Sequence, residues 1–130
     1  MTEREKMLAG ELYNCGDEEL LKQWHKAKNL IRIYNQLDYE LKEKQEQILN
    51  ELLGSRGANL WITAPFFIDY GNNIYIGNNC EINMNCTFLD CNKIIIGNNA
   101  LIASNVQIYT VFHPINRSEE HTSELQSPCG

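Results

Sequence analysis

The sequence predicts a mainly β fold, a parallel β-helix of short strands, that follows an α-helical N-terminal segment. Three observations support this prediction. Residues 1–56 repeat their apolar side chains at spacings of three and four, as amphipathic helices do. In residues 57–116 isoleucines recur every six positions, a period that fits neither an α-helix nor a hairpin sheet. Gly-Asn-Asn occurs three times in this second region, and both residue types tolerate the left-handed backbone that tight corners need.

The N-terminal segment contains three predicted helical stretches. Residues 1–13 form a short amphipathic opening. Asp17 is a good N-cap for a longer helix, because its carboxylate can accept hydrogen bonds from the free backbone N–H groups of the first turn. That helix has a stripe of Leu20, Leu21, Trp24, Ala27, Leu30 and Ile31. A further helix is predicted over residues 39–53, and Gly54 ends it. Its apolar face consists of Leu41, Ile48, Leu49, Leu52 and Leu53.

Residues 57–116 carry the six-residue repeat. The repeated positions are Ile76, Ile82 and Phe88, then, after a slip of two residues, Ile96, Ile102 and Ile108. A short strand and a tight corner take about six residues, so three sides close a triangular coil of ~18 residues. The repeated side chains then point inward and stack on one another. About two and a half such coils fit in the sequence, and Pro65 limits a central-strand assignment near their start.

Composition restricts the class of protein. The chain has 130 residues, enough for one ordinary domain or a small domain with an appendage. A net charge of −6 argues against nucleic acid and anionic membranes as partners. No apolar run approaches the ~20 residues that span a bilayer, and the first residues do not resemble a secretory signal. We therefore expect a cytoplasmic protein that binds neither nucleic acid nor membrane.

The five cysteines are better explained by packing than by metal binding. No CxxC pair occurs, and the spacings of Cys80, Cys86 and Cys91 match no zinc pattern, so no metal is predicted. Cys80 and Cys86 each stand four residues after a repeated apolar position. They are predicted to point inward, where a small apolar side chain fits.

These motifs resemble a known family. The stretches "YGNNIYIGNNCEINMNCTFLD" and "IIIGNNALIASNVQIYTVFHPI" closely resemble the hexapeptide-repeat sugar O-acetyltransferases, the maltose and galactoside acetyltransferases. The stretches "EREKMLAGELY", "LIRIYNQLD" and "ILNELLG" resemble the helical segment that precedes the left-handed parallel β-helix in those enzymes. The resemblance runs from about Thr2 to Ile115. It implies a helical segment over residues 1–56 and a left-handed β-helix over residues 57–116.

The resemblance also implies a reaction, the direct transfer of an acetyl group from acetyl-CoA to a sugar hydroxyl. His113, in "YTVFHP", matches the histidine that serves as catalytic base in the family. Imidazole suits this role because its pKa lies near the operating pH. The alternative for His113 is a surface histidine at a loop edge. Family members are trimers with active sites between subunits, so a homotrimer and a sugar acceptor are expected.

The resemblance implies roles for three further residues, Asn83, Asp69 and Asp90, and a gapless alignment gives Cys15, with Asp17 only nearby, for a fourth. Asn83 aligns with an asparagine of the family that lies close to both the acceptor and the thioester. An amide suits this place because it can both accept and donate hydrogen bonds. The alternative for Asn83 is a corner residue of the β-helix. Asp69 stands where the family places a short polar residue that contacts the acceptor. Asp90 is either an acceptor ligand or a turn former. Asp17 lies near the position of an acceptor-binding aspartate. Cys91 replaces a second carboxylate of the galactoside enzymes, which favours maltose or glucose as acceptor.

Residues 117–130, "RSEEHTSELQSPCG", break the repeat. They resemble the translation of a common sequencing adapter, and a disordered native tail is the alternative. A non-native tail would mean that the native sequence is truncated at its C-terminal end. In the family, the coils that follow supply most contacts to CoA. We therefore expect the 130-residue polypeptide by itself to have little or no activity.

Three functional hypotheses follow. The leading hypothesis is an acetyl-CoA-dependent O-acetyltransferase with a sugar acceptor. The second is an acetyltransferase with another acceptor, such as a nodulation-type oligosaccharide or an amine. The third is a non-catalytic β-helix that serves as a trimer scaffold. Replacement of His113 distinguishes the enzymes from the scaffold.

Overall fold

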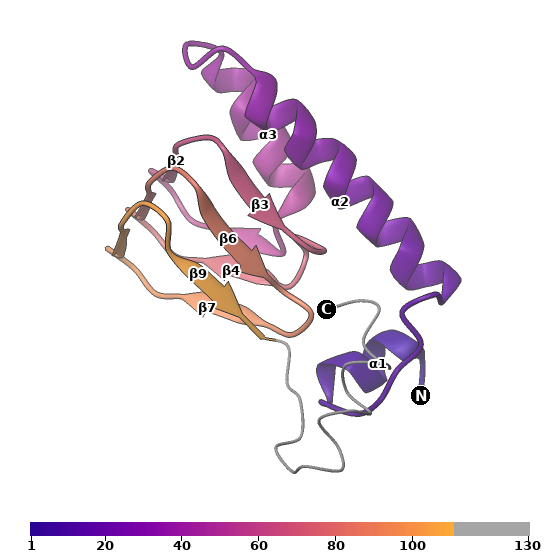
Figure 1. Ribbon diagram of the computed structural model, residues 1–130. Helices are drawn as coiled ribbons and strands as arrows, with labels where there is room; N and C mark the ends of the chain where they lie inside the picture. The colour runs from indigo at the N-terminus through magenta and orange to yellow at the C-terminus, as the bar shows by residue number, and fades with distance from the viewer. Residues whose placement is uncertain (111–130) are drawn as a thin grey trace.

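The computed structural model describes residues 1–110, in which three helices precede nine short strands (Figure 1). The helices are α1 (Glu3–Leu8), α2 (Glu18–Gln36) and α3 (Lys42–Leu52). The strands are β1 (Ser55–Arg56), β2 (Trp61–Ile62), β3 (Phe66–Ile68), β4 (Ile74–Ile76), β5 (Glu81–Ile82), β6 (Cys86–Leu89), β7 (Ile94–Ile96), β8 (Leu101–Ile102) and β9 (Gln107–Tyr109). The candidate base His113 and residues 117–130 lie outside the described part.

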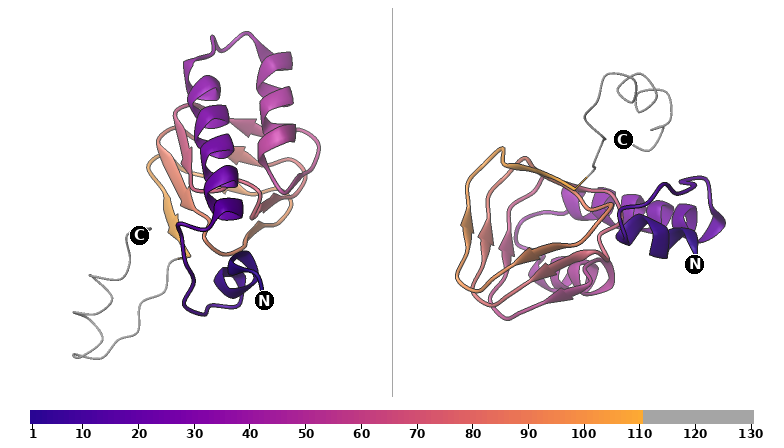
Figure 2. Two further views of the ribbon diagram at one scale, coloured as in Figure 1. Left: turned by 90° about the vertical axis from the view of Figure 1, so that its right-hand side faces the viewer. Right: turned by 90° about the horizontal axis from the view of Figure 1, so that it is seen from below.

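The strands form three parallel sheets, ordered β1-β4-β7, β2-β5-β8 and β3-β6-β9. Successive strands in the sequence belong to different sheets, so the polypeptide winds around a common axis, and the nested loops are visible along that axis in Figure 2. The predicted fold, a left-handed parallel β-helix after an α-helical segment, is confirmed.

Each coil is longer than predicted. Trp61 pairs with Glu81 and Glu81 with Leu101, so the strand register repeats every 20 residues rather than every ~18. The extra length lies in the third corner of the first two coils, because Ile68 and Ile76 are eight residues apart, as are Phe88 and Ile96. The slip that interrupts the six-residue period is therefore a regular feature of these two coils.

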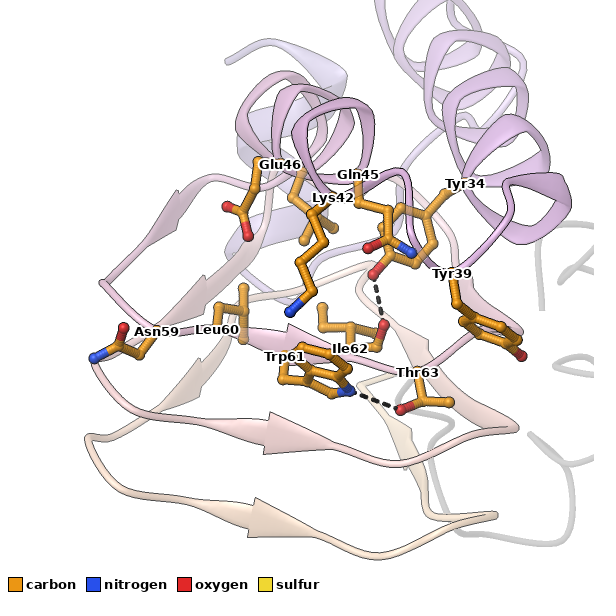
Figure 3. A pocket seen from close by; sticks show the side chains of 11 residues that line it. Tyr34, Tyr39, Lys42, Gln45, Glu46, Asn59, Leu60, Trp61, Ile62 and Thr63 are labelled. Carbon is orange, nitrogen blue, oxygen red and sulfur yellow. Dashed lines mark hydrogen bonds between the residues drawn. The ribbon is translucent and has the colours of Figure 1, made fainter.

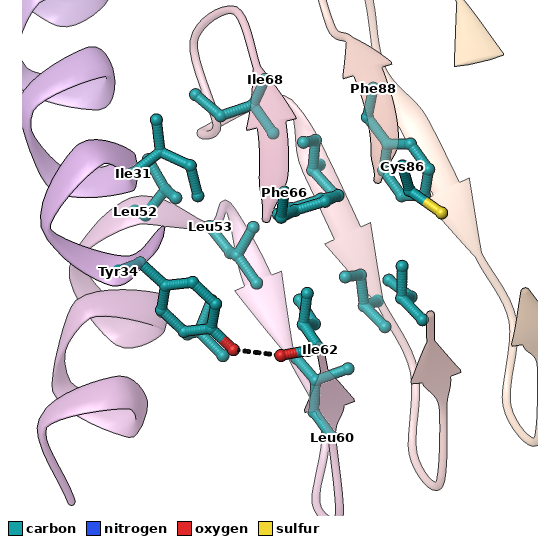
Figure 4. Packing of buried hydrophobic residues seen from close by; sticks show 14 of the residues in the cluster. Ile31, Tyr34, Leu52, Leu53, Leu60, Ile62, Phe66, Ile68, Cys86 and Phe88 are labelled. Atoms are coloured by element: carbon teal, nitrogen blue, oxygen red, sulfur yellow. Dashed lines mark hydrogen bonds between the residues drawn. The ribbon is translucent and has the colours of Figure 1, made fainter. Parts of the chain in front are cut away.

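The repeated apolar side chains share one interior, and Figure 4 shows part of its packing, with Phe66 and Phe88 among the labelled residues. Ile76, Ile82 and Phe88 are buried, and Ile96, Ile102 and Ile108 pack against the same core. The rings of Phe66 and Phe88, which belong to neighbouring coils, meet edge to face with centroids 5.1 Å apart. Cys80 and Cys86 are buried in this core, and their thiols donate to the carbonyl oxygens of Gly97 and Ala103. The predicted inward position of both cysteines is confirmed.

Asparagines build the corners. The non-glycine residues with positive φ are Asn59, Asn79, Asn85, Asn99 and Asn105, all at strand connections. Asn59 Nδ2 donates to Asn79 Oδ1 over 2.9 Å, and Asn79 Nδ2 donates to Asn99 Oδ1 over 3.2 Å, so this corner forms an amide ladder along the axis. Gly77 is needed beside the ladder, because a Cβ there would lie 2.4 Å from Asn98 Oδ1.

Helix α2 covers the free edge of the first coil (Figure 1). The two polar atoms of the Asn35 amide pair with the backbone N–H and C=O of Phe66, each over 2.9 Å. Four more carbonyls of the same edge accept hydrogen bonds, those of Ile62, Ala64, Ile68 and Tyr70, from Tyr34, Tyr39, Lys28 and Gln23 respectively. These side chains replace a missing neighbouring strand, and an uncovered edge would be a template for aggregation.

The helices depart from the prediction in detail. Asp17 caps α2 as predicted, because its Oδ2 accepts from the backbone N–H groups of Glu19 and Leu20. The side chains of the predicted apolar faces that are more than a third exposed are Leu21, Trp24 and Leu41. Because α2 rests on a strand edge rather than a broad sheet face, its buried stripe is narrow. No helix in residues 1–110 is long and apolar enough to cross a bilayer.

Candidate active site

Two of the predicted acceptor residues lie in one corner of the β-helix. The connections 69–73 and 90–93 occupy the third corner of the first and second coils and stack on each other. We call these residues the aspartate corner. Asp69 lies in the lower connection and Asp90 in the upper one, and the backbone N–H of Asp69 donates to Asp90 Oδ1 over 3.1 Å.

Asp90 is completely buried and holds the two connections together. Its carboxylate also accepts from the backbone N–H groups of Tyr70, over 2.9 Å, and Asn73, over 3.2 Å. Burial raises the pKa of Asp90 to about 6, although the hydrogen bonds from the backbone act in the opposite direction. These hydrogen bonds to the backbone of residues 69–73 fit the turn-forming role, one of the two roles predicted for Asp90. Its contact with an acceptor stays a prediction.

Asp69 is the carboxylate of this corner that a ligand can reach, since its side chain is 13% exposed. Its Oδ1 lies 3.7 Å from Lys28 Nζ, and its Oδ2 accepts from the thiol of Cys91 over 3.5 Å. The pKa of Cys91 is raised to about 12, mainly by burial and to a smaller extent by the negative charge of Asp69. The thiol is therefore protonated at neutral pH and acts as a donor, so the carboxylate of Asp69 is oriented by groups on two sides.

Sequence reasoning missed three neighbours of this corner, Lys28, Tyr13 and Tyr70. Tyr13 packs against a small core to which Tyr70 and Cys91 belong. Burial raises the pKa of the Tyr13 and Tyr70 phenols above the ordinary value of a tyrosine, so both are neutral hydrogen-bonding groups. Lys28 could be predicted as a neighbour of Asp69 only after α2 had been placed against the first coil. Nothing in the spacing of the sequence indicates that Tyr13 approaches Cys91.

Asp17 lies near the same corner, at the start of α2. Leu20, three residues later, packs in one cluster with Tyr70 and Cys91. The Oδ2 atom of Asp17 is already engaged with two backbone N–H groups as the helix cap. The observed role of Asp17 is structural, and a contact with an acceptor stays a prediction.

Asn83 does not join this group. It lies in the connection between β5 and β6, and its backbone N–H donates to the carbonyl of Ile102 over 2.9 Å. Strand β6 separates Asn83 from Asp90, and its four residues alone extend roughly 13 Å. Within one subunit, Asn83 and the aspartate corner therefore lie at opposite ends of one side of the β-helix.

A cavity of about 290 Å³ lies away from these residues, between the start of α3 and β2 (Figure 3). Lys42 Nζ stands 3.8 Å from the centre of the Trp61 ring, and the Tyr34 hydroxyl that faces the cavity donates to the Ile62 carbonyl. None of the predicted site residues lines it. In residues 1–110, no three His, Cys, Asp or Glu side chains are grouped so that they could hold a metal ion.

Comparison with known proteins gives the family. Residues 6–57 match the family model for the maltose acetyltransferase hexapeptide capping motif. Nodulation protein L of Rhizobium meliloti is 42% identical over 125 residues, which cover 96% of this chain and 68% of that protein. The chain spans 58–68% of the length of the curated relatives that it matches.

Two solved structures agree with this assignment. A maltose O-acetyltransferase from Clostridium difficile 630 superposes with a TM-score of 0.87 at 43% identity, and the match covers 94% of this chain and 65% of that one. A galactoside acetyltransferase in complex with coenzyme A superposes with a TM-score of 0.85 at 32% identity, over 94% of this chain and 61% of that one. The chain belongs to the maltose and galactoside O-acetyltransferase family of hexapeptide-repeat acetyltransferases.

Proposed function

We propose that the protein to which this chain belongs is an acetyl-CoA-dependent O-acetyltransferase that acts on a hydroxyl of a maltose- or glucose-type sugar. Family membership and the coenzyme A bound to a related galactoside acetyltransferase support the reaction class. The observation that carries the proposal is Asp69, an accessible carboxylate held between an ammonium and a thiol. A carboxylate so fixed suits a sugar, because it accepts hydrogen bonds from hydroxyls in a defined direction.

In the proposed mechanism, acetyl-CoA supplies the acetyl group as a thioester. Asp69 binds and orients the acceptor sugar, and Lys28 and Cys91 fix the direction of its carboxylate. His113 takes the proton of the reacting hydroxyl, whose oxygen attacks the thioester carbonyl. The C–S bond then breaks, the acetyl group stays on the sugar oxygen as an ester, and CoA leaves as the thiol with the proton returned by His113. The amide of Asn83 accepts from the sugar and donates to the carbonyl, which gains negative charge as the bond forms.

We further propose that Cys91 sets the acceptor preference. The position holds a buried, protonated thiol beside Asp69, whereas the resemblance places a second carboxylate there in galactoside enzymes. A thiol accepts hydrogen bonds weakly, so a sugar that requires a second strong acceptor at this position binds poorly. Maltose and glucose are therefore the preferred acceptors in this proposal.

We propose that the protein is a homotrimer whose sites lie between subunits. Support comes from the distance between Asn83 and the aspartate corner, which lie at opposite ends of β6. Asn83 of one subunit can meet Asp69 of the next if the corners of two β-helices face each other. Light scattering coupled to size-exclusion chromatography measures the assembly directly, and a monomer would contradict this part of the proposal.

Replacement of His113 tests the reaction. We expect His113→Ala to lower acetyl transfer to maltose by at least about 100-fold, because general-base catalysis contributes that much, while the assembly stays intact. The measurement is release of the CoA thiol by the protein as its gene encodes it. His25→Ala, which removes an exposed histidine of α2, is the matched control and should leave the rate unchanged. An unaffected rate in His113→Ala would contradict the mechanism.

The same assay separates the other hypotheses. Turnover with an amine or a nodulation-type oligosaccharide, but not with maltose or glucose, favours the alternative acceptor. No use of acetyl-CoA by either the parent or the His113→Ala protein favours the scaffold. Assay of the 130-residue polypeptide by itself tests the expectation that it turns over little acetyl-CoA.

A further inference from the structure

Trp24 lies beside the carboxylate to which we assign the acceptor sugar. The Lys28 ammonium is 3.7 Å from Asp69 Oδ1 and 5.2 Å from the centre of the Trp24 ring, so one cation contacts both the carboxylate and the indole. Lys28 also donates to the carbonyl oxygen of Ile68, the residue before Asp69, which fixes the ammonium at the aspartate corner. The indole and the proposed acceptor site are therefore neighbours.

A row of side chains on α2 leads to this position. Helix α2 runs beside β3 (Figure 1), where Asn35 contacts the start of the strand and Lys28 contacts its end. Trp24 stands one helical turn beyond Lys28 on the same face of α2. It therefore projects past the end of the strand, where Asp69 begins the aspartate corner.

The indole of Trp24 is a large apolar surface that the described part of the fold does not use. Trp24 is 37% exposed and belongs to neither buried cluster of residues 1–110. Within the same residues its Nε1 makes no hydrogen bond, whereas Nε1 of Trp61 donates to Thr63 Oγ1 over 3.2 Å. An accessible aromatic ring with a free N–H, next to a carboxylate and an ammonium, suits a ligand that is apolar on one face and polar at its edge.

We propose that Trp24 forms a second sugar subsite, so that the site prefers a disaccharide or longer saccharide to a single sugar. The inference rests on the proposed acceptor site at Asp69, which binds the hydroxyls of the first ring. The C–H face of the next ring packs on the indole, whose face carries partial negative charge. One helical turn, about 5.4 Å, is close to the length of one pyranose ring in a saccharide chain, so the spacing suits adjacent rings. The Lys28 ammonium, which contacts both positions, donates to the oxygen that joins the rings.

Kinetics with maltose and glucose test the subsite. We expect the KM for maltose to lie about fivefold below that for glucose, because only maltose has a second ring to pack on the indole. Trp24→Ala should bring the two values together, and Trp24→Phe, which keeps an aromatic face, should retain part of the difference. Trp61→Ala removes the other exposed tryptophan and is the matched control, in which the preference for maltose should persist. Equal KM values in the parent protein, or a preference that survives in Trp24→Ala, would overturn the inference.

Fluorescence separates the subsite from the reaction. The chain contains two tryptophans, so Trp61→Phe leaves Trp24 as the only indole. Maltose should change the emission of this variant in a saturable way and at lower concentration than glucose does, whereas Trp24→Phe should show no response. A response to maltose without acetyl transfer would refute the proposed reaction and support the subsite. Absence of the response, with or without acetyl transfer, would overturn the subsite. Dissociation of the assembly by Trp24→Ala, measured by light scattering, would place the indole at a subunit contact and overturn it as well.

Discussion

At Asp90, burial and hydrogen bonding act in opposite directions on one carboxyl group. Burial disfavours the ionised form, and three backbone N–H groups favour it. The net result is a pKa of about 6 in the folded protein, compared with an ordinary value of 3.8. The folded state thus binds the proton more tightly than the unfolded state does. Between these two pH values the free energy of unfolding falls as the pH rises.

Replacement of Asp90 by Asn tests this account. The amide does not titrate, so the wild-type protein should lose stability relative to Asp90→Asn between pH 4 and pH 7, by at most about 3 kcal/mol. Urea denaturation across this range measures the difference. Asp38→Asn, at an exposed carboxylate, is the control and should show no such trend. A difference that grows in favour of the wild-type protein as the pH rises would mean that the hydrogen bonds outweigh burial.

The sequence predicts the corner only in part. Asp69 and Asp90 are selected because "FIDYG" and "FLD" resemble stretches of a known family, not because of residue type, and the structure brings them together. That Asp90 is buried and Asp69 accessible depends on how two coils stack, which no local pattern contains. The approach of Tyr13 to Cys91 depends on the packing of the N-terminal segment and is equally invisible in the sequence.

At the scale of elements, α2 takes the place of a strand at the edge of the first coil. Asn35 is central to this contact, because its amide mimics the hydrogen bonding of a peptide group to Phe66. Backbone groups at a buried edge need partners, and their loss is costly. The amphipathic stripe predicted the helix but placed Leu21 and Trp24 inside, since a stripe does not reveal whether a helix meets a face or an edge.

Removal of the Asn35 amide should therefore destabilise the protein. We expect Asn35→Ala to lower the free energy of unfolding by about 2–3 kcal/mol, because two backbone groups of Phe66 lose their partners. Asn29→Ala, at an exposed position of the same helix, should change it by less than about 0.5 kcal/mol. Chemical denaturation of both variants decides the matter, and similar losses would show that the amide does not cap the edge.

At the scale of the whole molecule, the six-residue period predicts the β-helix because each inward side chain must meet its equivalent in the next coil. Ile82 illustrates this, since it is fully buried and pairs with Ile62 below and Ile102 above. The period underestimates the coil length, because the longer third corner appears in the sequence as a slip rather than as a repeated unit. Assembly leaves no comparable period in the sequence, so the proposed meeting of Asn83 with Asp69 of another subunit is not contained in the repeat.

The most direct test of the central claim mixes two damaged subunits. We expect Asn83→Ala and Asp69→Ala each to reduce acetyl transfer strongly when expressed alone. If each site combines Asn83 of one subunit with Asp69 of another, some sites in a mixed assembly contain both residues intact. Co-expression of the two variants, with purification of the mixed assembly through two different tags, should then restore part of the activity in the CoA-release assay. A mixed assembly as inactive as its parents would contradict a site shared between subunits.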